Sequence, residues 1–494
     1  MTVEDKEKVQ EVTGEVVLAA DRSALEILHA VLMEGVSCAG MEAAQLPQDV
    51  ATFRRDYPDA LARYEATRLN STERFTVAHR LLLALMPYLQ WQDARGTVPL
   101  AEALSASTVA PLPLRRHQFS GSGGWPVNVV YRGERYGGDG LGLLAERLLE
   151  RHVVTPEARD ALVDLAQGLC ANGSLDLKGR KIAIFGGGAE MAPTRLWLEA
   201  GADVLWLDVA EPPASWFEIT GMSGALSWAE GNVDLLTQPR EVLATLKAFA
   251  DGDPLDLGLY AYAPGRAREL RLTGTMNAMV DALPRELIGS VTMLVSPTTS
   301  TGLGDHDVAV MSERLTERPA WERVCDALGL LGRGGGSVAA GDARVARTVV
   351  AIQGASYQAA QYLGKVLTAE YWSRSGQLAS PGAEATTVEA LRVSANTAAI
   401  TQTRSLDHPV FAAAFGGAAA MGVETMTPRQ SRRLNGLLAV RDWTSQEAPV
   451  PGRIRVHGGI HTLPYPLQSA LRVAAAIGFV RAPRLLRALL KPRR

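Results

Sequence analysis

Short apolar runs alternate with helical segments from Leu177 onward, and no other feature constrains the fold of this chain as strongly. The apolar runs are KIAIFGG, ADVLWLDVA, LDLGLYAYAPG and SVTMLVSP, and the segments between them include the helical patterns PTRLWLEAG and TGTMNAMVDALP. Strands that are apolar on both faces and are separated by helices are typical of a parallel sheet covered on both sides. The sequence therefore predicts an α/β fold with a doubly wound parallel sheet.

The rest of the chain divides around this sheet into segments of different character. Helical periodicity dominates residues 1–115, where we expect a helical accessory domain. Residues 116–175 are glycine-rich and predict a hairpin with Arg-Gly at its turn, followed by a connecting helix. The sheet domain is expected to span residues 176–445, with an insertion at 302–345 that interrupts the alternation, and a basic amphipathic tail covers residues 446–494.

The tail has an unusual charge pattern. Its last 27 residues contain seven Arg or Lys and no acidic residue, with apolar residues between the cations. This pattern suits a helix that lies on an anionic membrane surface. It equally suits a terminal helix that packs on the core or on a partner subunit, so both interpretations stay open.

The overall composition excludes several classes of protein. Of 494 residues, 47% are hydrophobic and 21% charged, as in an ordinary globular protein with more than one folding unit. A net charge of −3 gives no reason to expect nucleic acid as a partner. No apolar run reaches the ~18 residues of a spanning helix, and the three cysteines lie far apart, so we expect a cytoplasmic protein. The motifs GDHD and HGGIH each lack a third ligand, and we expect no metal site.

A glycine-rich turn follows the first strand of the predicted sheet. Gly186, Gly187 and Gly188 would let the backbone approach a pyrophosphate at the start of the next helix. Asp208 ends the second strand about 20 residues later, where an acid accepts hydrogen bonds from a ribose. Glu190 places a carboxylate near the same helix start, where it would repel a phosphate. The pattern predicts a dinucleotide site with one unfavourable charge.

The segments LKGRKIAIFGGGAEMA and LEAGADVLWLDV resemble the opening of the short-chain dehydrogenase/reductase superfamily. They match the family turn T-G-x-x-x-G-x-G in register, although Phe185 replaces the threonine and Glu190 and Ala192 replace the last two glycines. The resemblance covers residues 176–440 and is closer to the enoyl-reductase branches. It implies a Rossmann-like fold that binds NAD(P).

The same resemblance implies further contacts with the cofactor. Asp234, in NVDLL, matches the acidic residue that contacts adenine, and Ala263 stands in the segment that is usually Asn-Asn-Ala-Gly. Thr401, with Thr403 as the alternative, would meet the nicotinamide carboxamide. Asp208 would repel the 2′-phosphate of NADP, so NAD is the preferred form.

Five residues match the catalytic positions of the family. Ser296 matches the catalytic serine, and Asn277 matches the helix asparagine that holds a proton-relay water. In GASYQAAQYLGK, Tyr357 and Tyr362 precede Lys365 by eight and three positions. A lysine cation lowers the pKa of a nearby tyrosine from near 10, which makes the phenol a better proton donor at neutral pH. The usual spacing of four is absent, but the longer gap of the enoyl-reductase branches favours Tyr357, with Tyr362 in reserve.

Together these features predict an NAD(P)-dependent reductase that acts on a carbonyl or an activated double bond of a fairly apolar small molecule. We expect a homo-oligomer without a nucleic-acid partner, in which the basic tail is the candidate for peripheral membrane contact. Two other functions stay open. One is a non-catalytic Rossmann-like scaffold or partner in a biosynthetic complex, and the other is a methyltransferase that uses the same sheet for S-adenosylmethionine.

Overall fold

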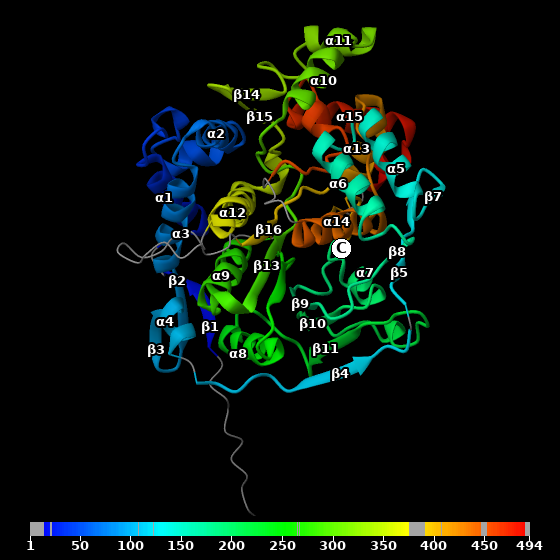
Figure 1. The fold of residues 1–494 in the computed structure, drawn as a ribbon. Helices are drawn as coiled ribbons and strands as arrows, with labels where there is room; N and C mark the ends of the chain where they lie inside the picture. The colour runs from blue at the N-terminus through cyan, green and yellow to red at the C-terminus, as the bar shows by residue number, and fades with distance from the viewer. Residues whose placement is uncertain are drawn as a thin grey trace, which may run out of the picture.

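Seven strands form the central sheet of the computed structural model, in the order β16-β13-β12-β9-β10-β11-β4 (Figure 1). Neighbouring strands run parallel except β4, which pairs antiparallel with β11 at one edge. The strands are β4 (Leu114–Gln118), β9 (Lys181–Phe185), β10 (Asp203–Leu207), β11 (Ala225–Ala229), β12 (Leu255–Leu259), β13 (Ile288–Met293) and β16 (Arg392–Ser394). The structure describes residues 14–19, 22–106, 108–121, 123–263, 265, 267–374, 391–406, 408–445 and 452–489. The protein is thus a mixed α/β fold with a mostly parallel central sheet.

Strand β9 shows why the predicted strands are apolar throughout. Successive side chains of a strand point to opposite faces of the sheet. Ile182 and Ile184 join one buried apolar cluster, and Ala183 and Phe185 join the cluster on the other face. Because both faces are covered, every position of the strand needs an apolar side chain.

Helices cover both faces of the sheet. The layer on one face contains α8 (Pro239–Ala250), α9 (Arg268–Ala282) and α12 (Ala355–Val366), which continues into a π-helical segment, η6 (Leu367–Trp372). The layer on the other face contains α5 (Gly140–Glu150), α6 (Pro156–Gln167), α7 (Thr194–Glu199) and α14 (Pro428–Thr444).

The N-terminal helices extend the first of these layers. They are α1 (Ala24–Val36), α2 (Val50–Asn70), α3 (Arg74–Leu85) and α4 (Leu100–Ser105). Between them lies a small antiparallel sheet of β1 (Glu15–Leu18), β2 (Leu89–Asp93) and β3 (Gly96–Pro99). Their apolar side chains belong to the same buried cluster as one face of the central sheet, and α1 to α3 lie beside α9 and α12 (Figure 1). The described part of the segment 1–115 therefore shares its core with the sheet, and the last two residues of the segment belong to β4.

The glycine-rich segment contains the expected hairpin. Strand β6 (Val129–Tyr131) pairs with β7 (Glu134–Tyr136), and Arg132 and Gly133 between them have φ values of 49° and 84°. Two positive φ angles are typical of the tight turn that matches the twist of a hairpin. A second short pair joins β5 (Trp125–Pro126) to β8 (Ser174–Leu175).

The insertion after β13 has structure of its own, away from the central sheet (Figure 1). It contains two helices and one hairpin: α10 (Asp305–Thr316), α11 (Ala320–Ala327), β14 (Ser337–Ala340) and β15 (Ala343–Ala346).

The C-terminal segment ends in helices that pack on the body of the protein. They are α13 (Pro409–Ala418), α15 (Leu467–Arg481) and α16 (Arg484–Leu489). Helix α15 lies so close to α13 that a Cβ atom at Gly417 would fall 1.9 Å from the carbonyl oxygen of Ala474. Helix α15 of the basic tail therefore packs on the body of the protein, as one of its two interpretations predicts. Val480 is 80% exposed on the outer face of this helix, and membrane contact through that face stays a prediction. None of the helices in the described part of the chain is long and apolar enough to span a membrane.

Candidate functional site

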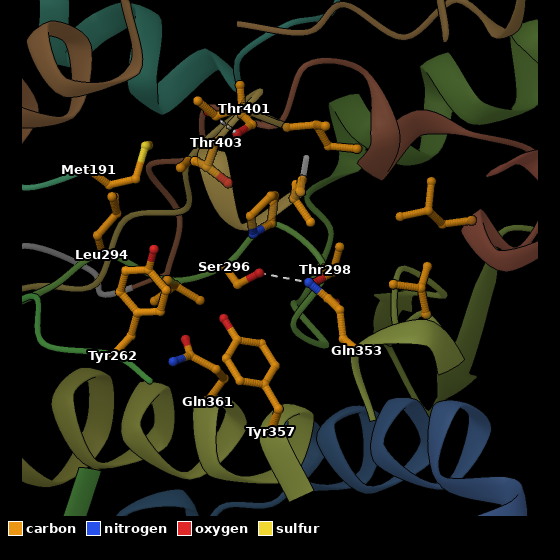
Figure 2. A pocket seen from close by; sticks show the side chains of 18 of the residues that line it. Met191, Tyr262, Leu294, Ser296, Thr298, Gln353, Tyr357, Gln361, Thr401 and Thr403 are labelled. Carbon is orange, nitrogen blue, oxygen red and sulfur yellow. Dashed lines mark hydrogen bonds between the residues drawn. The ribbon is translucent and has the colours of Figure 1, made fainter. Parts of the chain in front are cut away.

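A cavity of about 240 Å³ lies at the carboxyl edge of the central sheet (Figure 2). Its walls include the loops that follow three neighbouring strands: residues 260–262 after β12, 294–298 after β13 and 398–401 after β16. Helices α9, α12, α13 and α15 supply most of the remaining wall. Ligands of open parallel α/β sheets bind outside the carboxyl ends of the strands, so this cavity is the candidate site.

Most of the cavity wall is apolar. Helix α13 contributes Phe411 and Phe415, helix α15 contributes Leu467 and Leu471, and Leu463 lies just before α15. Cavities lined in this way, with a few polar groups at one place, are typical of small-molecule sites.

Polar side chains gather where α12 faces the loop after β13 (Figure 2). Ser296 Oγ lies 2.9 Å from Thr298 Oγ1, and Thr298 donates a hydrogen bond of 2.8 Å to Gln353 Oε1. Tyr357 and Gln361 are one turn apart on α12 and point toward the same region (Figure 2). The structure thus brings together Ser296 and Tyr357, two of the residues predicted to be catalytic.

Glu269 joins this polar end of the cavity, and sequence reasoning missed it. Its carboxyl group accepts a hydrogen bond of 2.7 Å from the backbone N–H of Ala263 and another from Gln361 Nε2. Burial raises the pKa of Glu269 to about 7, although these two hydrogen bonds oppose the shift. The signal in the sequence was only its position one helical turn before Thr273, which also lines the cavity from α9.

Tyr357 has the opposite electrostatic environment to the one expected. Burial raises the pKa of its phenol above the ordinary value, and the nearby carboxyl group of Glu269 and phenol of Tyr262 add to the shift. The position four residues after Tyr357, where the family carries its lysine, holds Gln361. An amide carries no charge that would favour the phenolate. The Tyr357 hydroxyl is therefore a neutral hydrogen-bond donor.

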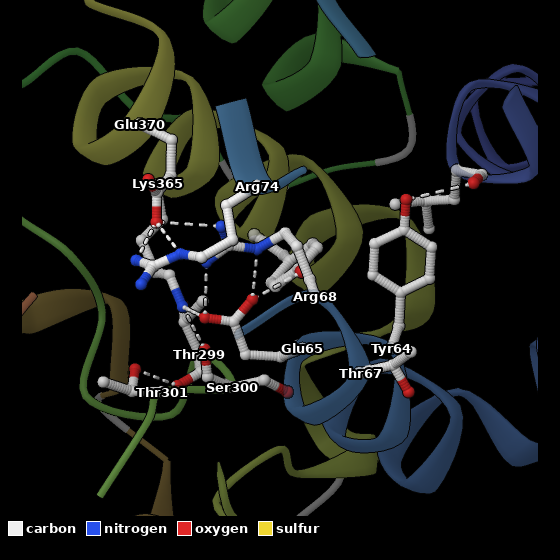
Figure 3. Close-up of polar contacts among 12 residues, drawn as sticks. Tyr64, Glu65, Thr67, Arg68, Arg74, Thr299, Ser300, Thr301, Lys365 and Glu370 are labelled. Carbon is white, nitrogen blue, oxygen red and sulfur yellow. Dashed lines mark hydrogen bonds and ion pairs between the residues drawn. The ribbon is translucent and has the colours of Figure 1, made fainter. Parts of the chain in front are cut away.

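Lys365 and Tyr362 do not line the cavity. Figure 3 shows Lys365 in a separate group of polar side chains. Lys365 Nζ makes an ion pair of 2.7 Å with Glu65 Oε1 on α2, and Tyr362 Oη donates a 2.6 Å hydrogen bond to Glu65 Oε2. The predicted pairing of Tyr357 with Lys365 is therefore corrected. Positions eight apart on a helix differ by about 80° in direction, and the buried Glu65 takes the lysine on its own side.

These side chains belong to a buried ionic cluster that joins α2 and α3 to α12 and η6 (Figure 3). Arg68 binds Glu65 through Nε at 2.8 Å and Nη2 at 2.9 Å, and it binds Glu370 through Nη1 at 2.9 Å. Arg74 also pairs with Glu370. Burial alone would raise the pKa of Glu65, but the charges of Arg68 and Lys365 outweigh it and lower the pKa to about 2. The cluster holds elements together, and Lys365 is part of it.

Asn277 and Thr401 line the cavity, but their polar groups are already bonded to the protein. Asn277 Nδ2 donates to the carbonyl of Thr273 at 2.8 Å, and its Oδ1 accepts from Trp372 Nε1 at 2.8 Å. Thr401 Oγ1 lies 2.8 Å from the carbonyl oxygen of Ala399, to which it donates. Asn277 thus ties α9 to η6, which is a different task from holding a relay water.

The glycine turn does not line the cavity and closes on neighbouring side chains of the protein. The N–H of Gly188 donates a 2.9 Å hydrogen bond to Asp208 Oδ2, and the N–H of Ala210 donates to Asp208 Oδ1 at 2.9 Å. The indole of Trp206 lies only 2.8 Å from the place where a Cβ of Gly187 would be. Gly186 has a φ of 81°, and a Cβ atom on it would lie 2.6 Å from the backbone of Ala261. The glycines therefore accommodate a protein side chain and a neighbouring loop.

A nicotinamide dinucleotide does not fit this turn in the usual way. Helix α7 begins only at Thr194, several residues after the glycines, and has six residues. The Asp208 carboxylate that would receive the ribose already accepts hydrogen bonds from two backbone N–H groups. Glu190 lies beside the turn and accepts a 2.9 Å hydrogen bond from the N–H of Arg404. The residues present thus do not form the expected pyrophosphate and ribose contacts.

Two further predicted cofactor residues lie away from the cavity wall. Asp234 Oδ1 accepts from the N–H of Leu236 at 2.9 Å, and its Oδ2 faces Arg268 Nη2 at 3.4 Å. The backbone N–H of Ala263 donates a hydrogen bond to the carboxyl group of Glu269. Of the seven predicted cofactor contacts, only Thr401 borders the cavity.

No model of a known family matches the sequence, and no curated protein does either.

Proposed function

We propose that the cavity binds a fairly apolar small molecule that carries a carbonyl-type oxygen. One observation carries this proposal: an apolar cavity has Ser296, Tyr357 and Glu269 gathered at one end. The apolar walls supply the hydrophobic contribution to binding. The hydroxyl groups of Ser296 and Tyr357 supply donors for an oxygen acceptor.

The strand order supports a Rossmann-like assignment for the sheet. Numbered along the chain, the six parallel strands lie in the order 3-2-1-4-5-6, which is the order of doubly wound dinucleotide-binding folds. The cavity lies beyond the carboxyl ends of the fourth, fifth and sixth of these strands. This is the half of the sheet that receives the reacting part of a ligand when the other half holds a nucleotide.

A nicotinamide-dependent reductase is the second candidate. Its support is the same strand order together with the shared location of Ser296 and Tyr357. The closed glycine turn and the distant Lys365 weigh against it. We therefore rank binding of the apolar molecule itself above reduction by NAD(P)H.

The binding proposal is tested with a matched pair of variants on α13. Ala414 lines the cavity, and Ala412, two residues earlier on the same helix, is exposed. The apolar dye N-phenyl-1-naphthylamine is expected to bind the wild-type protein saturably, with a rise in fluorescence. Ala414→Phe fills the cavity and should weaken dye binding at least about tenfold, a loss of about 1.4 kcal/mol, whereas Ala412→Phe should bind as the wild type does. Equal binding by both variants would show that the dye sits elsewhere and would remove the proposal.

Calorimetric titration distinguishes the nicotinamide-dependent reductase from a protein that binds only the apolar molecule. NADH, NADPH and S-adenosylmethionine are each titrated into the wild-type protein and into Asp208→Asn. Saturable binding of NADH that changes in Asp208→Asn would restore the reductase to first place. No response to any of the three leaves the apolar ligand as the proposed occupant.

A further inference from the structure

We infer that Glu269 moves a proton at the carbon next to the carbonyl group of the bound molecule, while the hydroxyl of Tyr357 holds the carbonyl oxygen. This inference rests on the proposed function and adds an activity to it. It needs no redox cofactor, and it assigns a task to Glu269, a residue outside the predicted catalytic set.

Glu269 is unusual among the residues around the cavity. It is 1% exposed, and it is the one carboxyl group among the described residues that line the cavity. No Lys, Arg or His side chain appears in that described lining. A structural carboxylate at such depth is normally paired with a cation, as Glu65 is in the ionic cluster. Within the part of the chain that the structure describes, the hydrogen-bond partners of Glu269 are the N–H groups of Ala263 and Gln361, and its carboxyl group can gain and lose a proton near neutral pH.

Gln361 binds this carboxyl group from the helix that also carries the phenol. It donates to Glu269 and lies one turn after Tyr357 on α12, so α9 and α12 present both groups to the same corner of the cavity. Figure 2 shows Tyr357, Gln361 and Tyr262 around this corner. The two groups also act on each other electrostatically: burial raises the pKa of the Tyr357 phenol, and the nearby Glu269 carboxyl group and Tyr262 phenol raise it further.

The chemistry balances with these two groups alone. The Glu269 carboxylate takes a proton from the carbon next to the carbonyl, and the electrons of that C–H bond form a carbon–carbon double bond. The π electrons of the carbonyl move to its oxygen, and the resulting enolate oxygen accepts the hydrogen bond of the Tyr357 hydroxyl. The Glu269 carboxyl then returns the proton. Return to the same carbon gives hydrogen exchange, and return two carbons further along a β,γ-unsaturated ketone moves the double bond into conjugation.

The physical setting favours this step. A general base is most effective when its pKa lies near the working pH, and burial raises the pKa of Glu269 to about 7. A neutral phenol in an apolar surrounding stabilises a developing oxyanion without first losing solvent. Both conditions follow from burial of the two groups in a cavity whose described wall holds no cation.

The test measures hydrogen exchange of two apolar ketones, 2-tetralone and 2-decanone, in D₂O by proton NMR. The full chain should bind at least one of them and accelerate loss of the signal from the protons next to its carbonyl. Glu269→Gln should lower this exchange about 100-fold or more and leave the dissociation constant within about threefold of the wild type. Asp281→Asn, which changes an exposed carboxylate of the same helix, should exchange at the wild-type rate.

Two further measurements remain decisive if Glu269→Gln folds poorly. The exchange rate of the wild-type protein should rise from pH 6 to pH 8 with a midpoint near 7, because the base acts when ionised. Tyr357→Phe should lower exchange about 100-fold without moving that midpoint upward.

The outcomes separate this inference from the proposed function. Ketone or dye binding without accelerated exchange, or full exchange by Glu269→Gln, overturns the inference and leaves the binding function standing. Absence of any binding of dye and ketones by the wild-type protein overturns both.

Discussion

Replacing Lys365 by methionine should weaken the fold and leave ligand binding and proton exchange intact. The ammonium group forms a 2.7 Å ion pair with Glu65 and a hydrogen bond to the carbonyl of Ser300, all of them buried. Methionine has a similar length and no charge. Glu65 keeps two hydrogen bonds from Arg68 after the change, so we expect a loss of about 1.5–3 kcal/mol, the range for one hydrogen bond to a charged group.

Glu65→Gln is the stronger perturbation of the same cluster. It leaves Arg68 and Lys365 buried against a neutral amide, and removing one partner of a buried ion pair costs about 3–5 kcal/mol. With an unfolding entropy of ~2.1 cal/mol/K per residue over 494 residues, a loss of 4 kcal/mol lowers the melting temperature by about 4 °C. The double variant with Lys365→Met removes one of the two stranded cations. It should therefore lose less stability than the sum of the single changes.

Differential scanning calorimetry and urea unfolding measure these losses. Asp56→Asn is the matched control, because Asp56 pairs with Arg55 on the surface of the same helix α2 and should cause no measurable change. Dye binding and ketone exchange by Lys365→Met should stay within about twofold of the wild type. An unchanged melting temperature together with lost exchange would refute the structural role and restore the pairing of Tyr357 with Lys365.

Three other predictions concern separate parts of the fold. Burial lowers the pKa of His461 well below its ordinary value, so the unfolded chain binds more protons below pH 6.5 and stability falls on acidification. His461→Gln should reduce this acid-induced loss of stability by up to about 1.4 kcal/mol for each pH unit below about 6.5. Melting temperatures of the variant and the wild type at pH 7.5 and 5.5 measure the difference, and the same pH dependence in both proteins would contradict this prediction. Gly478→Ala places a Cβ atom 1.8 Å from the carbonyl oxygen of Ala413, so α15 should separate from α13 and be released early in limited proteolysis. Gly186→Ala would put a Cβ atom at a residue with φ of 81°, 2.6 Å from the backbone of Ala261. It should lower the free energy of unfolding in urea by at least about 1–2 kcal/mol. Wild-type stability in either glycine variant would show that the backbone moves at little cost.

The buried strands could be predicted from the sequence alone. Each of the segments KIAIF, DVLWL and LDLGL carries apolar residues toward both faces, and the structure places them as the neighbouring strands β9, β10 and β12. The Arg-Gly turn of the hairpin was equally local, because its two positive φ angles depend on the residues in the turn. Such features depend on the solvent exposure and backbone preferences of residues close together in the chain.

The roles of the site residues depended on partners far away in the sequence. Tyr357 and Lys365 share one short helix, but Lys365 binds Glu65, which lies 300 residues earlier. The glycine pattern resembled a phosphate loop, yet the side chains that fill it come from the next strand, Trp206, and from the residue that follows this strand, Asp208. Glu269 gained its raised pKa from burial, and the sequence pattern carried only its position on a helix face. Local patterns therefore determined the strands and helices of this protein, whereas the pairing of charges and the lining of the cavity were decided by tertiary packing, because a buried charge takes whichever partner the fold brings within reach.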